Sequence, residues 1–85
     1  MKITIRLFAS LRERVGQSEL TREVESGLTV EGLWIMLAKE FPSLQPFTGK
    51  ILFAVNQAYA RGNHRLEVGD EVALIPPVSG GKNPC

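Results

Sequence analysis

Few side chains in this 85-residue chain are of a type that carries out chemistry. The sequence has one histidine and one cysteine, so neither an internal disulfide nor a multi-cysteine metal site can form. His64 lies in a polar stretch that predicts an exposed turn, whereas a general base requires a desolvated cleft. Cys85 has no activating neighbour other than Lys82. We therefore predict that the reactive atom is not an ordinary side chain and that the chain binds no metal and no cofactor.

The composition indicates one small globular domain. Hydrophobic residues make up 44% of the chain and charged residues 22%, close to the averages of globular proteins. The net charge is +1 and cations are not clustered, which argues against nucleic-acid binding. The apolar stretches are far shorter than the ~20 residues of a membrane span, and the N-terminus lacks the apolar region of a secretory signal. These features predict a cytoplasmic protein without a membrane segment.

Alternation predicts a half-buried first strand at residues 2–8. Ile3, Ile5 and Leu7 alternate with polar residues, which is the two-residue period of a strand. Phe8 falls on the polar side, so we expect it on the outer face of the sheet. A weaker alternating pattern at residues 18–25 predicts a second, exposed strand that is antiparallel to the first.

A short helix is predicted between these two strands. Ser10 and Glu13 have the spacing of a capping box, in which the hydroxyl and the carboxylate satisfy free backbone N–H groups at a helix start. Gly16 is expected to end this helix in a left-handed conformation.

The strongest periodicity predicts a long helix between Thr29 and Pro42. Thr29 is a favourable N-cap residue, and Pro42 stops the helix. Apolar residues recur with helical spacing along one face that we expect to be core, namely Val30, Leu33, Trp34, Leu37, Ala38 and Phe41. The proline- and glycine-containing stretch that follows, residues 43–49, predicts a loop.

Three further strands are predicted in the second half of the chain. Residues 50–56 are almost continuously apolar, which predicts a strand buried on both faces. A polar turn then leads to a short return strand at residues 58–60. A glycine–aspartate turn leads into the last strand at residues 72–75, and two prolines end it because proline cannot donate ladder hydrogen bonds.

This order of elements predicts an α+β fold of the β-grasp, or ubiquitin-like, type. Its mixed sheet would carry the long helix across one face and a short extra helix after the first strand. The first and last long strands should lie side by side at the centre. We expect residues 1–77 to form this single domain and residues 78–85 to form a flexible C-terminal tail that carries Gly80 and Gly81.

Two segments and a Val55-Asn56 pair carry a resemblance to a known family. The segments read Leu7-Phe8-Ala9-Ser10-Leu11-Arg12-Glu13 and Gly69-Asp70-Glu71-Val72-Ala73-Leu74-Ile75-Pro76-Pro77-Val78-Ser79-Gly80-Gly81. The second segment is highly specific, whereas a glycine pair alone is not. Together they resemble the small subunit of molybdopterin synthase, a sulfur carrier of the ubiquitin-like β-grasp class. The resemblance runs from residue 2 to residue 81.

The resemblance implies a role in molybdenum cofactor biosynthesis with Gly81 as the reactive residue. An ATP-dependent activating enzyme would adenylate the Gly81 carboxylate, and a sulfur donor would convert it to a thiocarboxylate. The carrier would bind the large synthase subunit in a heterotetramer and donate sulfur to cyclic pyranopterin monophosphate. It would act as a sulfur-donating subunit rather than as an enzyme alone, and the ATP would belong to the activating enzyme.

Partner contacts are expected on the outer side of the last strand and along the tail. Alternation places Val72 and Leu74 in the core and Ile75 on the opposite face, where it would join Phe8 in an exposed apolar patch. Arg12 is a candidate to pair with an acidic group of a partner. The thread that leads to the reactive glycine is expected to consist of Pro76, Pro77, Val78, Ser79 and Gly80. Prolines limit the entropy that such a thread loses on ordering, and glycines offer no Cβ to obstruct it.

The chain continues past the second glycine with Lys82-Asn83-Pro84-Cys85, whereas members of the family usually stop there. A carboxylate on Cys85 cannot become a glycyl thiocarboxylate. Three alternatives remain open: a protease removes the four residues, they were added to the natural chain, or this copy no longer carries sulfur.

Other functions also remain open. A thiamine-type sulfur carrier is one, although that family typically lacks the helix at residues 10–16. A ubiquitin-like modifier joined to lysines through Gly81 is another. A β-grasp interaction module without acyl chemistry is a third.

Overall fold

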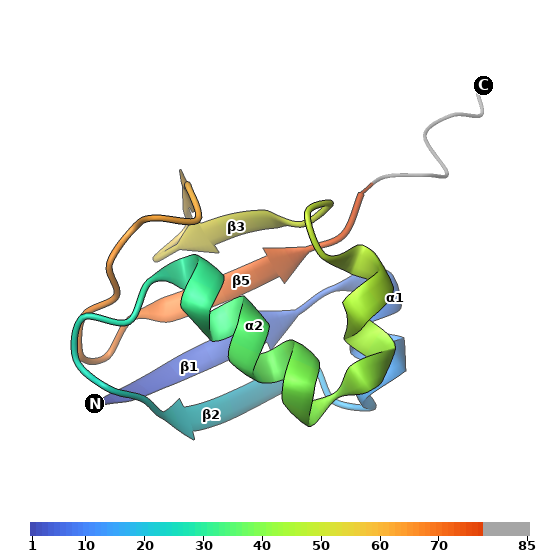
Figure 1. Ribbon diagram of the computed structural model, residues 1–85, viewed down its shortest axis with the longest axis horizontal. Coiled ribbons are helices and arrows are strands. Elements are labelled where there is room, and N and C mark those ends of the chain that lie inside the picture. The colour runs from blue at the N-terminus through green and yellow to red at the C-terminus, as the bar shows by residue number, and fades with distance from the viewer. Residues whose placement is uncertain (78–85) are drawn as a thin grey trace.

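The computed structural model describes residues 1–77, and the predicted tail at residues 78–85 lies outside this range. A five-stranded mixed sheet with the strand order β2-β1-β5-β3-β4 carries helix α2 across one face (Figure 1). The elements are β1 (Lys2–Leu7), α1 (Ala9–Val15), β2 (Glu19–Glu23), α2 (Val30–Glu40), the 3-10 helix η1 (Pro42–Phe47), β3 (Leu52–Val55), β4 (Ala58–Ala60) and β5 (Glu71–Ile75). The predicted β-grasp fold is confirmed.

β1 and β5 lie side by side at the centre of the sheet, as predicted. They pair in parallel, with Ile5 opposite Val72 and Leu7 opposite Leu74. β2 pairs antiparallel with the other edge of β1, and β3 pairs antiparallel with the other edge of β5. Because each central strand alternates, its inner side chains point towards α2 and its outer side chains point away from it.

The core lies between the inner face of the sheet and the helices. The predicted inner residues of both central strands are buried, and so is the apolar stripe of α2 apart from its last member, Phe41, which is half-buried. Thr29 caps α2 as predicted, because its Oγ1 accepts a hydrogen bond from the Gly32 N–H at 3.0 Å. Burial of this stripe against the rest of the core stabilises the fold.

The predicted capping box at Ser10 is wrong. α1 begins at Ala9, its N-cap residue is Phe8, and no side chain caps it. Ser10 therefore lies inside the first turn, where the Leu11 N–H donates to the Phe8 carbonyl at 3.1 Å. The burial of Leu11 fixes the start of this helix directly after β1. The predicted left-handed C-cap at Gly16 is confirmed, with φ +88°.

The prediction of a loop at residues 43–49 is also wrong for most of that stretch. Residues 42–47 form η1. Leu44 is fully buried, and its N–H donates to the Phe41 carbonyl at 2.9 Å. Proline is tolerated in the first turn of a helix because that turn needs no N–H donor. Burial of one leucine thus outweighs the breaker signal of Pro42 and Pro46.

β3 is shorter and less buried than predicted. Ala54 and Val55 are buried, but the side chain of Leu52 is 53% exposed. Leu52 pairs with Ile75 of β5 and lies beyond the end of β4, which pairs only with residues 53–55. In the described part of the chain, α2 covers one face of the sheet and no helix covers the other. The expectation of burial on both faces therefore holds at Ala54 and Val55 but is wrong at Leu52.

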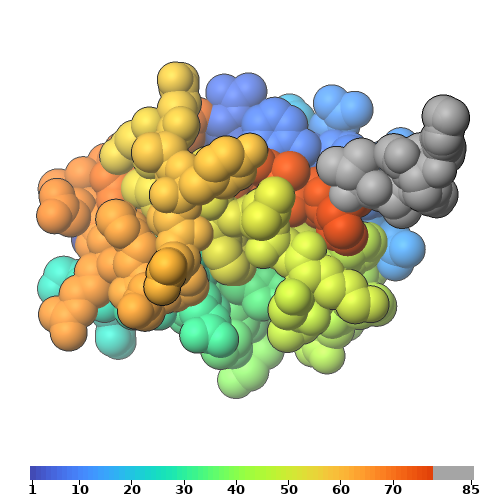
Figure 2. Space-filling model, turned by 90° about the horizontal axis from the view of Figure 1, so that it is seen from above, coloured from blue at the N-terminus to red at the C-terminus, as the bar shows by residue number. Residues whose placement is uncertain are grey.

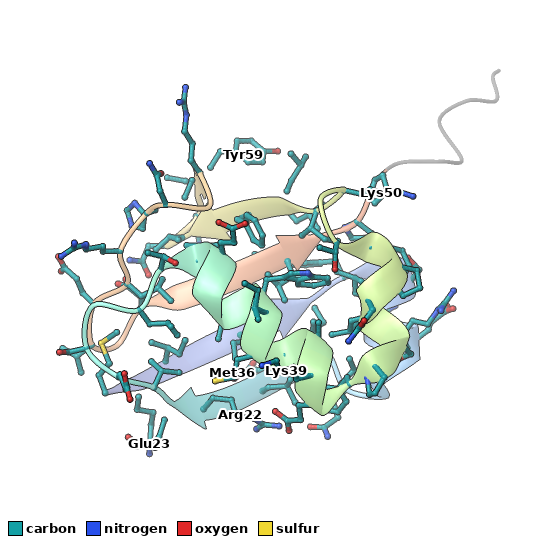
Figure 3. All side chains as sticks on the ribbon, in the orientation of Figure 1. Arg22, Glu23, Met36, Lys39, Lys50 and Tyr59 are labelled. Atoms are coloured by element: carbon teal, nitrogen blue, oxygen red, sulfur yellow. The ribbon has the colours of Figure 1, made fainter. Side chains whose placement is uncertain are left out.

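An ion pair connects the edge strand β2 to the end of α2. The Arg22 guanidinium donates two hydrogen bonds to the Glu40 carboxylate, and Arg22 lies near the lower edge of the sheet in Figure 3. The pKa of the Glu40 carboxyl lies below its ordinary value, and the largest cause is the hydrogen bond that Arg22 donates to it.

We expect Glu40→Gln to lower the free energy of unfolding at pH 7 by no more than about 1 kcal/mol, because the Glu40 side chain is 40% exposed. A lowered folded-state pKa stabilises the fold above the ordinary pKa of glutamate, and this contribution is lost as pH falls through the folded-state value. The difference between variant and parent in urea denaturation should therefore vanish towards about pH 2. A difference that persists there, or an equal effect of the exposed Glu13→Gln, contradicts this assignment.

Candidate functional site

The outer face of the sheet carries apolar side chains at the end where β5 finishes. β1 and β5 are paired up to Leu7 and Leu74, and the next residue on each strand is Phe8 and Ile75. Phe8 keeps an extended backbone, with φ −121° and ψ 153°, so its side chain continues the alternation onto the outer face. Phe8 is 41% exposed and Ile75 is half-buried. The structure thus brings together the two residues that the sequence predicted for this surface.

Phe8 is held by charged neighbours on the same face. The Arg6 guanidinium lies 5.9 Å from the centre of the Phe8 ring, a distance typical of cation–π contacts. The same guanidinium forms an ion pair with Glu71 at 3.2 Å. A hollow of about 250 Å³ opens between Phe8, Arg6 and Ala73. The hollow is therefore lined by both apolar and charged side chains.

Two residues of this surface were not predicted from the sequence, namely Leu52 and Tyr59. Leu52 lies opposite Ile75, and Tyr59 lies opposite Ala54, whose other neighbour is Ala73 of β5. Residues directly opposite one another share a face, so Leu52 and Tyr59 extend the patch across β3 and β4. Tyr59 is 78% exposed and projects at the upper edge of the molecule (Figure 3). We call the outer apolar face the set Phe8, Leu52, Tyr59, Ala73 and Ile75.

The described chain ends beside this face. Ile75 is the last residue of β5, which is paired on both edges, with β1 and with β3. Pro76 is buried and Pro77 is exposed, so the fold fixes the chain as far as Pro76. The remaining predicted site residues, Val78, Ser79, Gly80 and Gly81, lie outside the described residues.

Arg12 is exposed on α1, and its backbone carbonyl accepts the Gly16 N–H at 2.8 Å. No ion pair of its side chain is formed within residues 1–77. The partner contacts predicted for Phe8, Arg12, Ile75, Pro76 and Pro77 stay predictions.

The ionisable side chains of the described residues do not gather into a metal site. Within residues 1–77, no three His, Cys, Asp or Glu side chains are arranged to hold a metal ion. His64 is exposed, and its backbone carbonyl accepts the Val30 N–H at the start of α2. No helix in this part of the chain is long and apolar enough to cross a membrane. The site thus consists of the outer apolar face and the end of β5, after which the described chain stops at Pro77.

Comparison with known proteins covers both the domain and the C-terminal glycines. The ThiS family matches residues 5–81. The molybdopterin synthase sulfur carrier subunit of Escherichia coli (strain K12) is 41% identical over 93% of this chain and 99% of its own length. The subunit of the same name from Chlamydomonas reinhardtii is 40% identical over 95% of this chain and 100% of its own length.

Solved structures agree with the fold. The crystal structure of SAMP1 from Haloferax volcanii has a TM-score of 0.85 at 29% identity, over 95% of this chain and 100% of that chain. A chain of the complex of subunits 1 and 2 of molybdopterin-converting factor from Helicobacter pylori 26695 has a TM-score of 0.67 at 24% identity, over 95% of this chain and all of that chain. At that identity the second likeness concerns the fold alone. The described fold and the match over residues 5–81 lead to one conclusion: the chain belongs to the ThiS family.

Proposed function

We propose that this chain is the sulfur carrier subunit of a molybdopterin synthase and that the Gly81 carboxylate is its reactive group. The observation that carries the proposal is the extent of the family match, which runs through β5 and on to Gly81. Relatives at 40% and 41% identity bear the name of such a carrier.

The proposed chemistry has two stages. The Gly81 carboxylate attacks the α-phosphorus of ATP on an activating enzyme, which gives an acyl-adenylate and releases pyrophosphate. A donor that supplies sulfur at the oxidation level of hydrosulfide then displaces AMP and leaves a thiocarboxylate. In the second stage the carrier transfers this sulfur to cyclic pyranopterin monophosphate on the large synthase subunit, and water restores the carboxylate.

The geometry supports separate roles for the two parts of the chain: the outer apolar face would bind the partner, and the C-terminal segment would carry the reactive Gly81. The outer apolar face runs across the hydrogen-bonded strands β5, β3 and β4 and the end of β1, so a partner meets a surface that is already ordered, which lowers the entropy cost of binding. Pro76 fixes where the chain leaves that surface. A partner that binds the face therefore receives the segment leading to Gly81 at a defined place. Removal of residues 82–85 by a protease belongs to the same proposal, because only then is Gly81 terminal.

Reconstitution tests this function. A chain that ends at Gly81 is incubated with its activating enzyme, ATP and a sulfide source, and then with the large subunit and cyclic pyranopterin monophosphate. We expect the carrier to gain the mass of one oxygen-to-sulfur exchange and to lose it again as the pterin dithiolene forms. A Gly81→Ala variant of the same length serves as control. A carrier that gains sulfur but never passes it to the pterin contradicts the synthase assignment.

A ubiquitin-like modifier is the second candidate, and the likeness to SAMP1, a small archaeal modifier protein, favours it. A modifier leaves its glycine in an isopeptide bond, whereas a carrier cycles between carboxylate and thiocarboxylate. An N-terminally tagged chain expressed in its native cells distinguishes the two on a blot. Lysine conjugates of higher mass support the modifier, and their absence beside detectable thiocarboxylate supports the carrier.

A further inference from the structure

A second hollow, of about 460 Å³, lies away from the outer apolar face. α2 forms one wall with Trp34 and Ile35, and β3 and the segment before it form another with Ile51 and Phe53. The loop after β4 closes one end with Arg61. In Figure 2 the segment before β3, in yellow-green, and the loop after β4, in orange, lie on the two sides of this region, with green α2 below them. We call this hollow the hairpin groove.

The walls of the hairpin groove are fixed by hydrogen bonds. The Trp34 indole N–H donates to Thr48 Oγ1 at 3.0 Å, which joins α2 to the segment before β3. At the other end the Glu31 N–H donates to the Gly62 carbonyl at 2.8 Å. A Cβ on Gly62 would lie 3.2 Å from Glu31 Cβ, so glycine permits this close approach. The groove is therefore preformed, which is typical of binding sites.

One edge of the groove offers backbone hydrogen-bonding groups. The Asn56 N–H donates to Glu71 of β5, so by alternation along the strand the N–H and C=O of residues 51, 53 and 55 point the other way, towards β4. β4 pairs with residues 53–55 only. Among residues 1–77, no backbone partner is formed by Ile51. An extended peptide can pair with such an exposed edge.

The charges beside this edge are mainly positive. Lys50 precedes Ile51 and is exposed, and in Figure 3 it projects beside the segment that follows β5. Arg61 lines the opposite end of the groove and is also exposed. Glu31 is the one acidic residue of the lining. An occupant with acidic residues on both sides of an apolar one complements this pattern.

We propose that the hairpin groove binds an extended acidic segment of a partner protein. The segment pairs with the backbone of Ile51, places one bulky apolar side chain between Trp34 and Phe53, and sets a carboxylate beside Arg61. Phe53 faces the inner side of the sheet and Leu52 the outer side, so the groove and the outer apolar face open in different directions. A second protein can therefore hold the chain while the outer face is engaged. The inference does not depend on the proposed sulfur chemistry.

The test uses the ¹⁵N-labelled 85-residue chain and the peptide acetyl-Asp-Glu-Leu-Phe-Glu-Asp-amide. In a two-dimensional NMR titration we expect saturable shifts of the Trp34 indole and of the Ile51 and Arg61 amides. The same peptide with lysine in place of every acidic residue should cause none. Arg61→Glu should weaken binding at least about fivefold. Arg65→Glu, in the same loop but outside the groove, should leave binding unchanged.

Three results overturn the proposal. One is the absence of shifts in the groove at millimolar peptide. Another is shifts that centre on Phe8 and Ala73, which would assign the peptide to the outer apolar face. The third is a change of the groove resonances when the free chain is diluted, which would assign the groove to a second copy of the chain. Folding of each variant is checked from its amide spectrum before titration.

Discussion

A chain that ends at Gly81 should be adenylated by its cognate activating enzyme, whereas the 85-residue chain should not. The reason is stoichiometric, because only the shorter chain ends in a glycine carboxylate. ATP–pyrophosphate exchange measures this step directly. We expect the exchange rate of the 85-residue chain to be at background, a loss of several orders of magnitude. Since we expect residues 1–77 to form the folded domain, removal of residues 82–85 should leave its thermal unfolding unchanged.

Two control chains separate the effect of tail removal from other causes. A chain that ends at Gly80 tests whether the position of the carboxylate matters as well as its exposure, and we expect it to be inactive. A chain that ends at Gly81 and carries Ile75→Lys tests whether activation needs the outer apolar face. Equal exchange with the 85-residue chain contradicts the need for processing.

Ile75→Lys should leave the domain folded and weaken binding to the large synthase subunit by roughly 2 kcal/mol or more, the scale of an interface hot spot. Ile75 is half-buried on the outer face, so we expect a cost to folding of about 1 kcal/mol or less. Titration calorimetry measures the loss of binding, and thermal unfolding measures the cost to folding.

Val72→Lys is the matched comparison, because it makes the same change three residues earlier on the same strand. Val72 is fully buried and lies between Ile5 of β1 and Val55 of β3. An unpaired ammonium group there should cost more than about 3 kcal/mol, a large share of the stability of a small domain. If Ile75→Lys unfolds as readily as Val72→Lys, Ile75 belongs to the core and the docking face loses its central residue.

The faces of the central strands could be predicted because burial is one-sided there. In β1 and β5 every second residue is buried, and a shift by one residue would expose the whole apolar set. The pattern of Ile3, Ile5 and Leu7 therefore determines where Phe8 points, and Val72 and Leu74 do the same for Ile75. The structure agrees with both assignments, because Phe8 lies beside Arg6 and Ala73 and Ile75 lies opposite the exposed Leu52.

The outer residues of β3 and β4 could not be predicted in the same way. In the run from Ile51 to Val55 both faces carry apolar side chains, so alternation gives no sign that Leu52 is exposed. That exposure follows from the short length of β4, which no residue type in β3 encodes. The start of α1 was missed for a related reason, since burial of Leu11 and not the hydroxyl of Ser10 decides it.

The hairpin groove could not be predicted from the sequence at all. Its walls come from residues 31–35, 48–53 and 61–63, which meet only after the whole sheet has formed. Trp34 was correctly predicted to be core, and it is buried. Its indole N–H nevertheless reaches Thr48 at the base of the groove. The apolar periodicity of α2 predicts that Trp34 is buried. It does not indicate which edge of the indole ring lines the hairpin groove.

The most direct test of the carrier function is the intact mass of the protein purified from its native cells. We predict a species that lacks residues 82–85, together with a second species heavier by one oxygen-to-sulfur exchange. Tandem mass spectrometry should locate that exchange at Gly81. A single species of 85 residues with no sulfur-exchanged form, in cells that are making molybdenum cofactor, would contradict the proposed function.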